Sequence, residues 1–163
     1  ENRNILILTE RIAQVNYLFE TVETKQLATV GKYIGKMKQN ELDQSLTCRI
    51  LIGTYNMIEE GFDCKTLDTL IMATPKVRIE QSVGRILRKQ ACDRLNIPLI
   101  IDVCDMFCNF GRKGKQRITF YRKNNYKIEK YDIADKSTNV NNFIITKTLS
   151  KKAKKKVLLE YDF

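Results

Sequence analysis

The sequence contains no histidine, and its five cysteines form an odd, irregularly spaced set. Without histidine, every zinc site except an all-cysteine one is excluded, as are catalytic triads and general bases that need an imidazole. Cys104 and Cys108 lie close together in sequence, but two thiols do not complete a tetrahedral site. We therefore expect no metal site, and we expect a reducing compartment, cytoplasmic or nuclear.

Long hydrophobic runs are also missing, because each apolar run is far too short to span a bilayer. We therefore expect no membrane partner. The first residues lead directly into a short strand-like run, so no signal peptide is expected. What the chain does contain is 163 residues, of which 43% are hydrophobic and 29% are charged. This composition suits one folded domain, or one domain with an extension.

The positive charge is concentrated at one end of the chain. Residues 1–108 hold equal numbers of basic and acidic side chains, whereas residues 109–163 hold 15 basic and 5 acidic ones. The whole net charge of +10 therefore lies in the last third, which is densest at Lys151–Lys156. Such a gradient indicates a polyanionic partner, most often nucleic acid. A solvated tail without a partner is the alternative.

Short apolar segments alternate with helical patterns through most of the chain. Segments typical of strands buried on both faces lie at 5–8, 27–30, 48–53, 69–73 and 99–103. Helical patterns fall between them, at 10–24, 36–46, 55–60 and 78–89. This alternation predicts an α/β fold in which a parallel sheet is sandwiched by helices. Ligands bind such sheets at the carboxyl edge, where Thr9 and Thr54 are expected to lie.

Beyond residue 108 the pattern changes. Residues 111–124 are typical of a basic helix with Ile118 and Tyr121 packed inward. Residues 126–131 and 142–148 alternate with period two, which predicts a hairpin, and residues 149–163 are expected to form a mobile or helical tail. We therefore divide the chain into a domain at 1–125 and a basic C-terminal extension at 126–163.

Two groups of polar residues allow more than one interpretation. Asp102 and Asp105 could be metal carboxylates, but we favour a role in ending a strand and capping the next element. Tyr121, Tyr126 and Tyr131 could stack on bases beside their lysines, but we favour packing against the domain.

The segment Gln81–Arg88 has the composition of a phosphate clamp. Arg85 and Arg88 are three residues apart on a predicted helix and therefore share one face. Gln81 lies one turn before Arg85, and Gly84 lets a second backbone come close. Guanidinium forks match phosphate oxygens and keep their charge. Without further context, two such arginines more often pair with carboxylates.

The context for these two arginines comes from the resemblance of several segments to the motifs of a known protein family. Residues 81–88 resemble motif VI of superfamily 2 helicases and translocases, whose pattern is Gln-x-x-Gly-Arg-x-x-Arg. Residues 50–54 with 60–63 are similar to motif V, residues 5–9 to motif IV and residues 30–35 to motif IVa. These segments follow the family's order and spacing over about residues 3–125. Each is weak by itself, but the ordered set is specific.

The resemblance implies a RecA-like fold and, within the family, the second of two such lobes. The first lobe's Gly-x-x-x-x-Gly-Lys-Ser/Thr loop and Asp-Glu-x-Asp/His box do not occur in the sequence. ATP and Mg²⁺ would therefore be bound mainly by an N-terminal lobe that this sequence does not contain. That lobe, in the same polypeptide, is the expected partner, and this chain alone is expected to be inactive as an ATPase.

The family's residue roles transfer only to matching positions. Arg88 matches the arginine finger that meets the γ-phosphate, and Arg85 matches its companion, so both are candidate catalytic residues. The candidate nucleotide-binding residues are Gly61, Asp63, Gln81 and Gly84. Asp63 would either accept from the ribose hydroxyl or hold an arginine. The candidate nucleic-acid contacts, which would be to phosphates, are Thr9, Gly35 and Thr54.

Details of the motifs point to a subgroup. Gln81 replaces the histidine of the DEAD-box group, and residues 84–89 resemble the Gly-Arg-Ile/Val-Leu-Arg-Lys form. That form occurs in the XPB- and UvsW-type DNA helicases and in the transcript-release helicases of large DNA viruses. The resemblance favours duplex DNA as the track, with RNA as the alternative, and a viral source. A non-catalytic nucleic-acid-binding or protein-docking module on a degenerate RecA-like fold is the competing interpretation.

Overall fold

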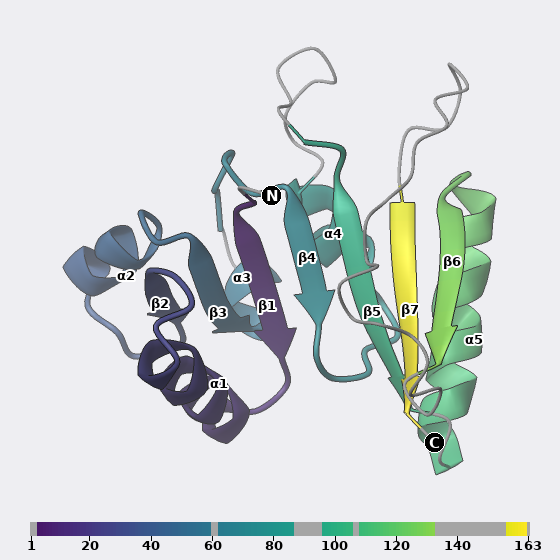
Figure 1. Cartoon of the computed structure of the whole chain (residues 1–163), viewed down its shortest axis with the longest axis horizontal. Coiled ribbons are helices and arrows are strands. Elements are labelled where there is room, and N and C mark those ends of the chain that lie inside the picture. Colours follow the sequence, from purple (N-terminus) through teal and green to yellow (C-terminus); the bar gives the residue numbers. More distant parts are fainter. Residues whose placement is uncertain (1–2, 60–61, 87–95, 106–107, 133–155, 163) are drawn as a thin grey trace.

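The computed structural model describes residues 3–59, 62–86, 96–105, 108–132 and 156–162. Its strands form a seven-stranded sheet in the order β2-β3-β1-β4-β5-β7-β6, and each neighbouring pair is parallel (Figure 1). The strands are β1 (Ile5–Thr9), β2 (Val30–Tyr33), β3 (Ile50–Thr54), β4 (Thr69–Met72), β5 (Leu99–Asp105), β6 (Lys127–Asp132) and β7 (Lys156–Asp162).

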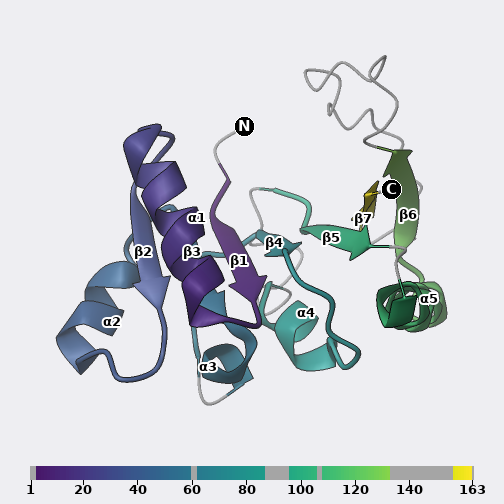
Figure 2. The ribbon, with the colours of Figure 1, turned by 90° about the horizontal axis from the view of Figure 1, so that it is seen from below.

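Five helices connect the strands of the described chain. They are α1 (Ile12–Thr24), α2 (Gln39–Ser45), α3 (Tyr55–Glu59), α4 (Glu80–Ile86) and α5 (Cys108–Lys123). In Figure 1, α1 lies in front of the sheet and α3 and α4 lie behind it. Seen from below in Figure 2, α3, α4 and α5 occupy the same side of the sheet. The predicted α/β fold with a parallel sheet between helices is therefore confirmed.

The alternation of side chains along β1 and β3 explains the two layers. Ile50 and Ile52 face α1, where they pack with Val15 and Val22 in a small apolar core. Leu6, Leu8 and Leu51 face the other way and belong to the larger core beneath α3, α4 and α5. Each of these leucines is at most 1% exposed, and burial of such a side chain contributes roughly 1.5–3 kcal/mol.

The C-terminal third differs from the prediction. The helix predicted at 111–124 is present as α5, and the strand predicted at 126–131 is present as β6. However, β6 pairs in parallel with β7, so it does not form a hairpin with that strand, and residues 142–148 lie outside the described residues. Residues 156–162 form a strand between β5 and β6, where a mobile or helical tail was predicted.

The strand at 156–162 was not predicted because of the residues that precede it. Val157, Leu158 and Leu159 are apolar, but they follow the lysine run that dominates the local charge. Hydrogen bonding to β5 and β6 on both sides satisfies the backbone of this segment, which sequence periodicity alone does not reveal. The proposed boundary at residue 125/126 falls between α5 and β6, and it stays a prediction.

Candidate nucleotide and nucleic-acid interface

The candidate nucleic-acid residues lie at one edge of the sheet. Thr9 and Thr54 end the neighbouring parallel strands β1 and β3 and are register partners. Tyr33 ends β2 beside Gly53, and Gly35 follows two residues later. The parallel strands thus bring Thr9 and Thr54 to the carboxyl edge, as the sequence indicated, and Gly35 lies close to the same edge.

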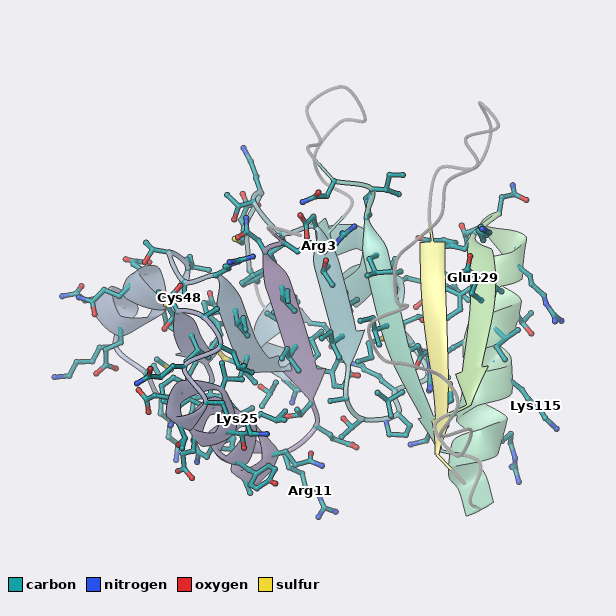
Figure 3. The ribbon with its side chains drawn as sticks, in the orientation of Figure 1. Arg3, Arg11, Lys25, Cys48, Lys115 and Glu129 are labelled. Atoms are coloured by element: carbon teal, nitrogen blue, oxygen red, sulfur yellow. The ribbon has the colours of Figure 1, made fainter. Side chains whose placement is uncertain are left out.

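Both threonine side chains at this edge are buried. Thr9 is 0% exposed and its hydroxyl donates to the backbone carbonyl of Arg11 at 3.1 Å, while Thr54 is 9% exposed. Helix α1 begins at Ile12 and has Arg11 as its N-cap, so Thr9 does not cap the helix. At this edge the exposed groups include the side chain of Arg11, which points away from the sheet in Figure 3.

The second part of the segment similar to motif V, residues 60–63, has two described residues, and they differ in burial. Phe62 is 1% exposed and meets the ring of Tyr33 edge-on, with ring centroids 5.0 Å apart. The buried ring anchors the segment, and the next residue, Asp63, is exposed. A carboxylate that reaches the surface at this position can be contacted by a ligand or by a facing domain. Gly61, the third residue predicted here, lies outside the described residues.

Helix α4 carries the segment similar to motif VI. Ser82 and Val83 are buried, whereas Gln81 and Gly84 are exposed. A Cβ atom at Gly84 would have no neighbour within 4 Å among the described residues, so the space beside this glycine is open. Arg85 lies within α4, one turn after Gln81. Arg88 lies outside the described residues, so its position relative to Arg85 stays a prediction.

A buried charged cluster lies beneath the loop that precedes α4. Arg117 of α5 is 1% exposed, and its Nε donates to Asp102 Oδ2 at 2.7 Å. The Tyr121 hydroxyl donates to the same oxygen at 3.0 Å, and Arg117 Nη2 donates to Cys104 Sγ at 3.2 Å. Burial raises the pKa of the Asp102 carboxyl, while the bonds from Arg117 and Tyr121 oppose that shift.

The position of Asp102 contradicts the favoured interpretation, in which this residue ends a strand and caps the next element. The residue neither ends its strand nor caps a helix, because β5 continues to Asp105 and Asp102 is 0% exposed inside it. The signal in the sequence was a carboxylate at a core position between Ile100 and Cys104, which needs a hydrogen-bonding or charged partner when it is buried. Tyr121 and Tyr126 pack within the core, as favoured, with centroids 5.6 Å apart.

The loop between β4 and α4, residues 73–79, also contacts α3. The Tyr55 hydroxyl donates to the Thr74 carbonyl at 2.7 Å. Lys76 pairs with Glu59, and its Nζ lies 4.8 Å from the centroid of the Tyr55 ring. From the opposite side, Arg117 Nη1 donates to the Lys76 carbonyl at 3.0 Å. Local sequence carries no signal for these contacts, because the partners are far apart in the chain.

Metal-binding and membrane-spanning features are absent from the described ranges. Within them, no group of three or more cysteine, aspartate or glutamate side chains is arranged to hold a metal ion. The helices described there include none with the length and apolarity needed to cross a bilayer.

Known proteins resemble this chain in sequence and in fold. No family model matches it. It is 39% identical over 136 residues to "Putative ATP-dependent RNA helicase L396" of Acanthamoeba polyphaga mimivirus, covering 82% of this chain and 26% of that protein. It is 30% identical over 147 residues to "Putative helicase 161L" of Invertebrate iridescent virus 6, covering 80% of this chain and 32% of that protein. The chain thus spans about a third or less of these relatives.

A solved structure shares the fold. The C-terminal part of the Fun30 ATPase domain matches with a TM-score of 0.57 at 11% identity, over 70% of this chain and 39% of that one. The two viral relatives match most of this chain, and the motif order follows a helicase's second lobe. By sequence the chain is related to a part of these putative viral helicases, and it has a RecA-like fold that it shares with the C-terminal part of an ATPase domain, consistent with a helicase C-terminal lobe.

Proposed function

We propose that this chain is the C-terminal motor lobe of an ATP-dependent superfamily 2 helicase or translocase. In this function Arg85 and Arg88 are the catalytic arginines that meet the phosphates of ATP held by an N-terminal lobe. Gly61, Asp63, Gln81 and Gly84 face the nucleotide across the cleft between the lobes. ATP and Mg²⁺ are bound mainly by that N-terminal lobe, and the chain alone does not hydrolyse ATP.

One observation supports this proposal most strongly. Gln81 and Gly84 are exposed on α4, the helix that follows β4 in the chain, and β4 pairs with β1, which ends at Thr9 beside Thr54 of β3. The open space beside Gly84 fits the close approach of another backbone. An interlobe nucleotide site and a nucleic-acid track need such a connection through one sheet, because closure of the lobes on ATP must change the contacts to the track.

For the track we propose nucleic acid, with duplex DNA favoured by the form of motif VI. The name of the mimivirus relative specifies RNA, and the name of the iridescent virus relative specifies only a helicase. Thr9 and Thr54 are buried as whole residues, so phosphate contacts at this edge would be made by Gly35 and by exposed groups beside the threonines, such as Arg11. Such contacts bind without reading sequence.

The basic helix α5 supports a polyanionic partner. It contains no acidic residue, and its exposed cations are Arg112, Lys115, Arg122 and Lys123. Figure 3 shows Lys115 pointing outward from α5. Cations on one helix that are not balanced by carboxylates attract phosphate backbones, and such binding weakens with salt.

The test is the ATPase activity of a protein in which this chain is joined to its N-terminal lobe. We expect turnover stimulated by duplex DNA more than by single-stranded DNA or RNA, and no turnover by the chain alone. Strongest stimulation by RNA would show that RNA, not DNA, is the track, and it would still support the motor function. A two-lobed protein that binds all three polymers but hydrolyses ATP on none would instead support the non-catalytic binding module.

A further inference from the structure

The buried cluster of α5 and β5 is joined to the loop that carries the proposed catalytic helix. The three side-chain nitrogens of Arg117 donate hydrogen bonds to three acceptors. These are the Asp102 carboxylate, the Cys104 sulfur and the backbone carbonyl of Lys76. The first two acceptors are on β5, and the third is in the 73–79 loop. Arg117 therefore links a fixed strand to the segment that leads into α4.

We infer that Arg117 is a positioning residue for ATP hydrolysis: by holding the Lys76 carbonyl it fixes the 73–79 loop and thereby the orientation of α4, which carries Arg85. This inference rests on the proposed function. Arg117 itself would touch neither ATP nor nucleic acid, because its side chain is 1% exposed within the core.

The contacts of Arg117 suit a group that holds the 73–79 loop in a fixed position. Within the core, the Asp102 carboxylate accepts from Arg117 and is itself held by the Tyr121 hydroxyl, and the planar guanidinium presents its donors in fixed directions. The group that it holds in the loop is a backbone carbonyl, so the contact constrains the path of the chain and not a rotatable side chain. The constrained residue lies four positions before Glu80, where α4 begins.

The opposite side of the same loop is held by α3. Tyr55 binds the Thr74 carbonyl, and Glu59 pairs with Lys76. Helix α3 directly follows β3, whose last residue is Thr54, and lies between the two parts of the segment similar to motif V, residues 50–54 and 60–63. The loop is therefore fixed between the nucleic-acid side of the sheet, through α3, and the C-terminal region, through α5. A shift in either contact would change where α4 points.

A purely structural role for Arg117 makes different predictions. Arg117→Lys keeps a positive charge near Asp102, but a single ammonium cannot reproduce three donors in fixed directions. Tyr121→Phe is the matched control, because it removes a hydrogen bond from the same carboxylate oxygen without touching the loop. If the cluster only stabilises the fold, Arg117→Lys and Tyr121→Phe should change hydrogen exchange and kcat in the same pattern.

Hydrogen exchange of the chain itself tests the contact without any assumption about activity. We expect Arg117→Lys to speed exchange of residues 73–83 by about tenfold, as the loss of one charged hydrogen bond would. Exchange in β1 and β3 should stay unchanged, and Tyr121→Phe should leave residues 73–83 unaffected. Unchanged exchange in Arg117→Lys, or equal changes across the domain in both variants, would overturn the inference.

The catalytic consequence is measured in the two-lobed protein. We expect Arg117→Lys to lower kcat by on the order of a hundredfold, as displacement of a catalytic group can, with little change in the KM for ATP or in nucleic-acid affinity. Tyr121→Phe should keep wild-type kcat. Faster loop exchange with an unchanged kcat would overturn the positioning role.

A second variant acts from the other side of the loop. Tyr55→Phe removes only the hydroxyl that binds the Thr74 carbonyl, and it should lower kcat in the same way even if Arg117→Lys does not fold. Wild-type kcat in Tyr55→Phe would contradict the inference. A wild-type protein that hydrolyses no ATP would overturn the proposed function, and the exchange experiment would then decide the loop contact by itself.

Discussion

The two faces of the sheet bury different kinds of groups. On the α1 face the core consists of aliphatic side chains, with Val15, Val22, Ile50 and Ile52 at its centre. On the face covered by α3, α4 and α5 the core also encloses the ion pair of Asp102 and Arg117. Apolar contacts are non-directional, whereas a buried ion pair requires a defined geometry. The difference indicates that one face mainly stabilises the fold and the other also orients the site.

The largest stability effect is expected from breaking the ion pair on one side only. Asp102→Ala leaves Arg117 buried and uncompensated, and should lower the free energy of unfolding by about 3–5 kcal/mol. On the other face, Ile52→Val should cost about 0.5–1.5 kcal/mol, because it removes one buried methylene group. Urea unfolding of the chain compares the two. Equal losses would contradict the contrast between the faces.

Replacing both charges should cost much less than removing one. Asp102→Leu combined with Arg117→Met fills similar space without a buried charge, and such replacements are often neutral in stability. Unfolding of the two single variants and the double variant gives the coupling energy, expected to be about 2–3 kcal/mol. Additive losses would mean that the two side chains do not act as a pair.

Because the space beside Gly84 is open, a substitution there should affect the stability of the chain and its ATP turnover differently. Gly84→Ala should leave the chain unchanged or stabilise it by up to about 1 kcal/mol, since the added Cβ meets no described atom and glycine is a poor helix former. In the two-lobed protein the same change should lower ATP turnover by about tenfold, equivalent to about 1.4 kcal/mol of lost interlobe contact.

Gly114→Ala provides the control for that variant. Gly114 is also helical, and a Cβ there would meet Cys104 Sγ at an ordinary distance of 3.5 Å. It should leave turnover unchanged. If Gly84→Ala leaves turnover unchanged as well, no facing backbone approaches this position during catalysis.

The smallest effect is expected from the basic surface of α5. Arg112→Ala and Lys115→Ala should each weaken nucleic-acid binding modestly and reduce its salt dependence by about one released counterion. Lys25→Ala removes the same charge from an exposed position at the end of α1 and should have no effect. Fluorescence titrations at several salt concentrations measure all three. Equal effects from Lys25 and Lys115 would indicate nonspecific attraction.

The order and type of most elements follow from local sequence. The apolar run 5–8 predicts β1 because its residues pack on both faces of the sheet, and Gln81 and Gly84 could be assigned to a helix from their spacing. These features depend on residues a few positions apart. The prediction also placed Thr9 and Thr54 at one edge, because the carboxyl ends of neighbouring parallel strands lie at the same edge of a sheet.

The features that the sequence did not predict depend on distant partners. The position of β7 between β5 and β6 results from pairing across a long separation in sequence. The link from Arg117 to the Lys76 carbonyl joins a helix to a loop 41 residues earlier. A carboxylate such as Asp102 in a buried strand shows that a partner exists, but only the packing of α5 identifies it.

The proposed function requires that this lobe supply the arginines that complete an ATPase site. Arg88→Ala in the two-lobed protein tests it most directly, with ATP turnover and nucleic-acid affinity measured on the same samples. We expect kcat to fall by roughly a thousandfold or more, the contribution of an arginine finger, while nucleic-acid binding is retained. Wild-type turnover by the Arg88→Ala protein would contradict the assignment.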